Sequence, residues 1–278
     1  MYKKVLYIFI SLLLVVTLSG CNSIDRVKVK MGIRNTEFDF MKKNEVKQLV
    51  IESRRDKGYR FVVTNEDVIK DVREILASAK KVENKSQLEN DYILEIHERN
   101  GKIHKYKYIA GLDKKDGGNF YSEDGKEQFI VSSRLDNDIL NNFENIRKPR
   151  KFKEVYYPSI IAGLKKFTTE NKSDISGKTI GFNFNEDIEV QKFLLSLDIE
   201  SFTEMAAIDY PMVKFVNDTS DCDYTLTVNT EGYTSIVYKA IIKVINNKTN
   251  KEDIYYVKSD YQDKEWKVNI FNKKPEGF

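Results

Sequence analysis

Few residues of this chain have side chains suited to catalysis, because its 278 residues include two cysteines and two histidines. Cys222 stands among three acids, Asp218, Asp221 and Asp223. Carboxylate oxygens bind hard cations such as calcium, but this cluster lacks the glycine and the distal glutamate of an EF-hand loop. We therefore interpret it as a solvated loop. Neighbouring acids disfavour a nucleophilic thiolate, so we expect Cys222 to be a small buried residue.

His97 and His104 stand on either side of Asn100-Gly101, a dipeptide typical of hairpin turns. A two-residue turn would place the histidines directly opposite each other, as a metal site requires. That register would also mix apolar and polar residues on each face of the hairpin.

A three-residue loop with Gly101 in the left-handed conformation keeps one face of the hairpin apolar. It pairs Glu98 with Lys102 and brings Glu95 against Lys105. The histidines then point to opposite faces. We expect a surface His97, a half-buried His104 and no metal between them.

Motifs of common enzymes are missing from the sequence. It has no Gly-x-Ser-x-Gly elbow, His-Glu-x-x-His helix, glycine-rich phosphate loop or Cys-x-x-Cys pair. We expect no catalytic residue, no metal and no cofactor. A pair of carboxylates from distant positions, as used in glycoside hydrolysis, stays open as an alternative.

The first residues have the pattern of an export signal. Lys3 and Lys4 precede an apolar run, Val5 to Leu18, that is too short to span a bilayer comfortably. The next residues, Leu18-Ser19-Gly20-Cys21, resemble the lipobox of bacterial prolipoproteins. The resemblance implies that residues 1–20 are a cleaved signal peptide and that acyl chains such as palmitate anchor Cys21 in the membrane. A signal anchor with a chance cysteine is the alternative.

Location and partners follow from these expectations. The composition, rich in Lys, Asn and Ile, suggests a Gram-positive source, where the lipoprotein would lie on the extracytoplasmic face of the cell membrane. Lys28, Lys30, Lys42 and Lys43 could face anionic head groups, although a solvated basic face is the simpler interpretation. With 46 basic and 43 acidic residues, the near-balanced charge argues against a nucleic-acid partner. An acylated Cys21 leaves Cys222 without a disulfide partner.

Hydrophobic periodicity predicts an α+β domain over residues 21–147. We expect extended runs at 27–31 and 61–63, then a helix from Glu66 capped by Thr64 or Asn65. A hairpin over 92–108, a strand at 129–131 and a helix from about Ser133 complete the domain.

A second α+β domain is predicted over 158–278, after a basic linker at 148–157. We expect a helix beginning near Pro158, a strand at 179–184 and a helix at 186–197, with 202–216 unassigned. From Tyr224 onward the alternation is that of strands, and the chain ends in three antiparallel ones. Both domains are expected to be antiparallel sheets with packed helices.

Two further resemblances bear on function. Val63 to Asp67 and Glu98 to Lys102 resemble parts of uncharacterised α+β domains in Gram-positive lipoproteins. Asp223 to Val228 and Ile245 to Lys251 resemble the ending of envelope-assembly lipoproteins. Together they imply a non-catalytic module that binds an envelope protein. A receptor for a small ligand or ion and a cell-wall-acting enzyme are the alternatives. The tyrosines expected on the binding surface are Tyr224, Tyr233, Tyr238, Tyr255, Tyr256 and Tyr261.

Overall fold

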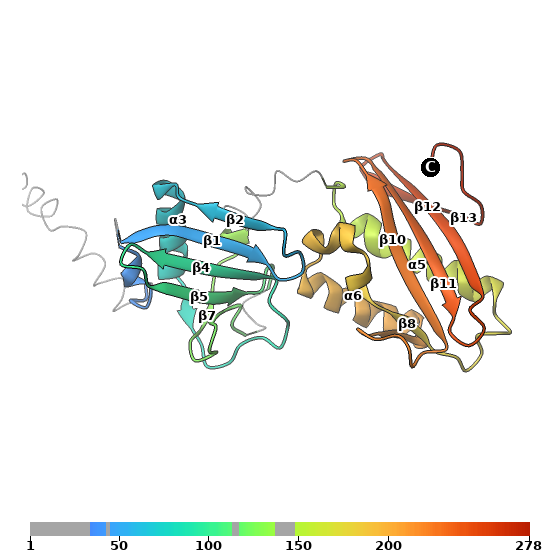
Figure 1. Ribbon diagram of the computed structural model, residues 1–278, viewed down its shortest axis with the longest axis horizontal. Helices are drawn as coiled ribbons and strands as arrows, with labels where there is room; N and C mark the ends of the chain where they lie inside the picture. The colour runs from blue at the N-terminus through green and yellow to red at the C-terminus, as the bar shows by residue number, and fades with distance from the viewer. Residues whose placement is uncertain (1–33, 43–44, 113–116, 137–147) are drawn as a thin grey trace, which may run out of the picture. The chain divides into compact units, whose positions relative to one another are not determined.

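The computed structural model describes residues 34–42, 45–112, 117–136 and 148–278 (Figure 1). The residues that resemble a lipobox, with Cys21, the extended run predicted at 27–31 and most of the helix predicted from Ser133 lie outside these ranges. None of the helices within them is long and apolar enough to cross a bilayer.

The chain forms two compact units, and both are α+β. The first unit comprises residues up to 51 together with 61–87 and 93–142, and the second comprises 52–60, 88–92 and 143–278. A mixture of sheet and separate helices confirms the predicted fold class.

A seven-stranded sheet in the order β2-β1-β4-β5-β6-β7-β3 forms the centre of the first unit. Its strands are β1 (Val46–Ser53), β2 (Arg60–Val63), β3 (Lys80–Lys81), β4 (Tyr92–Glu98), β5 (Ile103–Tyr108), β6 (Phe120–Ser122) and β7 (Gln128–Ile130). Strand β1 was not predicted from the sequence. The consecutive residues Leu49, Val50 and Ile51 are all buried, so this inner strand lacks the alternation of a strand with one solvated face.

Helix α3 (Glu66–Ala77) confirms the predicted capped helix. The Asn65 side chain accepts hydrogen bonds from the backbone N–H groups of Asp67 and Val68, which the first turn leaves without intrahelical partners. Its apolar stripe, which includes Val72 and Leu76, is buried. A short 3-10 turn, η1 (Asp39–Met41), precedes the sheet.

The second unit contains a six-stranded sheet in the order β13-β12-β11-β10-β8-β9. Its strands are β8 (Ile180–Phe182), β9 (Val213–Phe215), β10 (Tyr224–Tyr233), β11 (Val237–Asn246), β12 (Glu252–Gln262) and β13 (Glu265–Phe271). The strands from β10 to β13 are antiparallel, as the alternation predicted. The sheet is nevertheless mixed, because β8 pairs in parallel with both β10 and β9.

Helix α5 (Lys153–Glu170) packs against β11, β12 and β13 (Figure 1). The approach is close at Gly163, where an added Cβ would lie 2.5 Å from Cδ1 of Ile242. The helix begins at Lys153, five residues before Pro158, and Val155 and Tyr156 are fully buried. The predicted basic linker, 148–157, therefore ends earlier than expected and contributes its last residues to a core.

The helix predicted at 186–197 is wrong. Residues there form two 3-10 segments, η3 (Phe184–Glu186) and η4 (Ile188–Phe193). The α-helix of this region is α6 (Ser196–Asp209), which falls largely in the stretch left unassigned. Its apolar residues are spread around the whole helix, and Met205 and Ile208 are exposed, so it lacks the single stripe that periodicity detects.

Candidate functional site

The strands β11 to β13 have one face packed against α5 and one face that no helix of the described residues covers. On β10 to β12 the side chains of the packed face are mostly buried, and those that alternate with them are at least partly exposed. On β13 the packed face is partly buried. The register places Ile241, Tyr256 and Phe271 in one apolar row across β11, β12 and β13. Lys239 and Lys258 lie opposite each other on one side of this row, and Lys243 lies on the other side. We call these six residues the lysine-aromatic face.

The segment 272–278 lies against the lysine-aromatic face. The amine of Lys239 donates to the carbonyl oxygen of Gly277 at 2.8 Å, and the amine of Lys258 donates to that of Glu276 at 3.1 Å. The Phe278 ring packs edge-on against Tyr256 with a centroid separation of 5.3 Å. These contacts join the open face of β11 and β12 to the segment 272–278, which has no regular secondary structure.

A cavity of about 460 Å³ adjoins this segment. It is lined by Glu231, Gly232, Tyr233, Thr234, Val237, Lys239, Lys274 and Phe278. The backbone is irregular here, because the pairing of β10 with β11 shifts register between Thr230 and Gly232. The segment therefore leaves part of the surface beside it open.

Most of the tyrosines expected on the binding surface do not lie there. Tyr224, Tyr238 and Tyr255 are core residues with at most 8% of their surface exposed. Tyr233 pairs with buried Tyr238, and Tyr261 pairs with Trp266, so both belong to the face that α5 covers. Of the six tyrosines, Tyr256 alone lies on the open face. The odd-numbered residues of β12 point to the core, and Tyr256 is at an even position.

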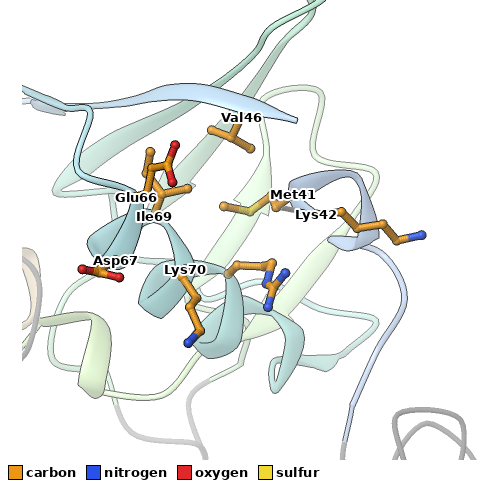
Figure 2. A pocket seen from close by; sticks show the side chains of 8 residues that line it. Met41, Lys42, Val46, Glu66, Asp67, Ile69 and Lys70 are labelled. Atoms are coloured by element: carbon orange, nitrogen blue, oxygen red, sulfur yellow. The ribbon is translucent and has the colours of Figure 1, made fainter. Parts of the chain in front are cut away.

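A second cavity, of about 410 Å³, lies beside α3 in the first unit (Figure 2). It is lined by Met41, Lys42, Val46, Glu66, Asp67, Ile69, Lys70 and Arg73. Figure 2 shows Met41, Val46 and Ile69 turned toward the same space, while Lys42 and Lys70 extend from its rim. An apolar floor with charges of both signs around it is suited to binding. It contains neither a histidine nor a cysteine.

The hairpin of β4 and β5 has the three-residue loop predicted from the requirement that one face of the hairpin be apolar. The N–H of Glu98 donates to the carbonyl of Lys102 at 2.8 Å, and Gly101 has a φ of 92°. The Lys105 amine lies 2.8 Å from Glu95, as that register requires.

The two histidines of this hairpin have separate carboxylate partners on opposite faces. Nε2 of His97 lies 2.8 Å from Glu95, and Nε2 of His104 lies 2.6 Å from Glu98. The hydrogen bond from His104 lowers the pKa of Glu98. Burial acts to raise the pKa of Glu95, but its hydrogen bonds to Lys105 and His97 lower it overall. His97 is less exposed than predicted, because its ring packs along Glu95 with 20% of the side chain accessible.

The acids around Cys222 point in different directions. Asp218 accepts from the N–H of Ser220, and Asp223 accepts from the N–H of Thr179. These backbone bonds lower the pKa of both carboxyls, to about 2 for Asp223. Within the described ranges no three His, Cys, Asp or Glu side chains gather as a metal site would require. Cys222 is buried, as predicted.

A buried polar network in the second unit was not identified from the sequence. Asp187 is 3% exposed and accepts hydrogen bonds from the N–H of Thr230 at 3.2 Å and from its hydroxyl at 2.8 Å. The Tyr238 hydroxyl lies 2.9 Å from the same hydroxyl. Burial raises the pKa of Asp187 to about 6. Asp187, Thr230 and Tyr238 are all buried, so the network is a structural element of the core.

A buried ion pair also belongs to the second unit. Nη1 of Arg55 lies 2.8 Å from Oδ1 of Asp91, and both side chains are at least nine-tenths buried. Ser196 adds two bonds, since its hydroxyl accepts from Arg55 at 2.7 Å and its N–H donates to Asp91 at 2.8 Å. With these partners the charges are compensated.

Part of the chain is similar to one known protein family. A family model described as YhfM protein matches residues 42–149. That stretch contains β1 to β7 and α3, so the likeness concerns the predicted N-terminal domain. No curated protein and no solved structure matches the chain. The finding fits the expected likeness to an uncharacterised α+β domain.

Proposed function

We propose that this chain is a membrane-anchored extracytoplasmic lipoprotein that binds another component of the cell envelope without catalysing a reaction. The observation that carries the binding role is the lysine-aromatic face. It is the open side of a sheet whose other side packs a complete core. Aromatic residues such as Tyr256 and Phe271 are enriched in protein interfaces, and this row of apolar side chains supports the binding role.

Three further observations support the proposal. Leu18-Ser19-Gly20-Cys21 resembles a lipobox, which would make Cys21 the site of acylation, and two acyl chains anchor a protein stably where one does not. The histidines each pair with a glutamate of their own hairpin, which leaves neither beside a nucleophile. Cys222 is buried. The two histidines and Cys222 thus lie in structural surroundings.

The anchoring part is tested by labelling cells with palmitate. We expect label on the wild-type chain and none on Cys21→Ser, which should leave the membrane fraction or stay uncleaved. Equal labelling of both chains would contradict acylation at Cys21.

The binding part is tested by crosslinking in intact envelopes followed by capture of the chain. We expect a defined crosslinked protein that is lost when Tyr256 and Phe271 are both replaced by Ala. Ile188→Ala is a matched control, because Ile188 is an exposed apolar residue away from this face. Retention of the crosslink in the double variant, or its loss in the control, would count against the face.

The cavity beside α3 favours a second candidate function, a receptor for a small amphiphilic ligand. Its volume of about 410 Å³ falls within the range of ligand pockets. Its rim has three cations and two acids, so a zwitterion with an apolar side chain fits its chemistry. We expect free leucine or phenylalanine to raise the unfolding temperature of the wild-type chain and not of Lys70→Ala. No shift with any zwitterion would remove this alternative.

A further inference from the structure

Lys239 and Lys258 are a pair of like charges directly opposite each other on β11 and β12. Such a pair is unfavourable unless an acceptor lies between or beside the two amines. Neither amine has a carboxylate within 4 Å among the described residues. Each amine instead donates to a main-chain carbonyl of the segment 272–278. The face therefore holds two cations whose only hydrogen-bonding partners there are neutral oxygens.

A carboxylate is the stronger partner for a lysine amine. A carbonyl oxygen offers the cationic amine a hydrogen bond, whereas a carboxylate offers the same hydrogen bond and the Coulomb attraction of an opposite charge. A carboxylate at either position would also relieve the repulsion between the two amines. Glu252 and Asp260 lie on the same face but toward the two ends of β12, so the three lysines around the apolar row form a local excess of positive charge. This local charge complements an acidic ligand.

The segment itself shows which kind of chain the face accommodates. It places main-chain carbonyls on Lys239 and Lys258 and an aromatic ring on Tyr256. Gly277 has a φ of 69°, and this turn brings the Phe278 ring back to the sheet. Lys274 lies 5.6 Å from the centre of the same ring. The contacts are those of a peptide, with one aromatic anchor and two oxygen positions.

The segment is held weakly enough to be displaced. Both lysine bonds are exposed to solvent, where water competes for the amine and for the carbonyl oxygen. The segment has no regular secondary structure, and the cavity beside it leaves room for further residues of a ligand.

We propose that the lysine-aromatic face binds an acidic, extended peptide segment of a partner protein in place of residues 272–278. Carboxylates of the partner pair with the amines of Lys239 and Lys258, and an aromatic side chain takes the position of Phe278 on Tyr256. The inference rests on the proposed binding function and specifies its partner.

The test uses fluorescence anisotropy with the full-length chain in detergent. The probe is a labelled octapeptide with the sequence of residues 271–278 in which Lys273 and Lys274 are replaced by Glu. Two control peptides keep both lysines or replace Phe278 by Ala. We expect a chain that ends at Asn272 to bind the acidic probe about tenfold more tightly than the complete chain, since it has no competing segment.

Variants of the shortened chain locate the site. We expect Lys239→Ala with Lys258→Ala to weaken binding at least about tenfold, and each control peptide to bind more weakly than the probe. Lys251→Ala, in the turn between β11 and β12, is the matched control and should bind as the shortened chain does. If the shortened chain unfolds, Phe278→Ala in the complete chain serves instead, with circular dichroism as the check on folding.

Several results would overturn the inference. Equal binding before and after removal of 273–278 would show that the segment does not compete. Undiminished binding to the double lysine variant would place the peptide elsewhere. Polyphosphate that binds as tightly as the probe would identify a general polyanion surface. If the probe fails but the envelope crosslink still depends on Tyr256, the face remains a binding site and only the acidic-peptide partner is wrong.

Discussion

Asp187 is a buried carboxyl whose protonation should be visible in the stability of the protein. Its pKa rises from an ordinary value of 3.8 to about 6 because burial disfavours the charged form. The unfolded chain therefore loses this proton at lower pH than the folded chain does. Between about pH 4 and pH 6 the folded state binds more protons, so its stability falls as the pH rises through this window.

The magnitude follows from the difference in pKa. Each pKa unit corresponds to about 1.4 kcal/mol, so ionisation of Asp187 costs the folded state about 3 kcal/mol by pH 7. Asn at this position accepts the hydrogen bond of the Thr230 N–H and can donate to the Thr230 hydroxyl, but it does not titrate. Asp187→Asn should therefore gain about 3 kcal/mol of stability relative to wild type between pH 4 and pH 7.

Urea unfolding at half-unit steps of pH measures this difference. The variant is compared with wild type at every pH, so titrations common to both chains cancel. Asp174→Asn, which replaces an exposed carboxyl, is the control and should follow the wild-type curve. A constant difference between Asp187→Asn and wild type across pH 4 to 7 would refute the assignment of a raised pKa to Asp187.

Three substitutions test how individual residues stabilise the fold, each by thermal and urea unfolding. Gly163→Ala should destabilise by about 1–3 kcal/mol, since its Cβ would meet Ile242, and a neutral result would show that Ile242 can move. Asn65→Ala removes the cap of α3 and should cost about 1 kcal/mol, whereas Asn65→Ser should restore most of it. Asn119→Ala should cost about 1–3 kcal/mol, because its buried side chain bonds both the N–H and the carbonyl of Val131. Unchanged stability would mean that water replaces those bonds.

Local patterns were sufficient to predict the elements whose signals lie within a few residues. Asn65 before an apolar stripe located α3, because capping and periodicity act over single turns. The alternation of apolar and polar residues on either side of Gly101 predicted the register of the β4–β5 hairpin. That register places His97 and His104 on opposite faces. These features depend on neighbours in sequence.

Elements that depend on the rest of the fold were missed. Strand β1 is buried on both faces, so its residues carry no alternation, and β9 pairs in parallel with a distant strand. Residues 186–197 have the composition of a helix, but the helical structure is interrupted at Asp187. The Asp187 side chain accepts hydrogen bonds from Thr230 and does not cap a continuous helix.

The strands that carry the proposed site were predicted, but the face on which each tyrosine lies was not. The strands from Tyr224 onward were recognised, and binding was assigned to their tyrosines. Which face each tyrosine occupies depends on where α5 packs, and the alternation alone cannot give that. Tyr224, Tyr238 and Tyr255 proved to be core residues, while Lys239, Ile241 and Lys243 lie on the open face. The lysines at alternate positions of β11 were the available signal.

Photocrosslinking from position 256 tests the central claim most directly. A benzoylphenylalanine replaces Tyr256 in the full-length chain, and a second chain carries it at Ile208, an exposed position on α6. We expect light to join position 256 to one defined envelope protein in living cells, and position 208 to give no such product. No product at 256, or the same products from both positions, would contradict a binding function of the lysine-aromatic face.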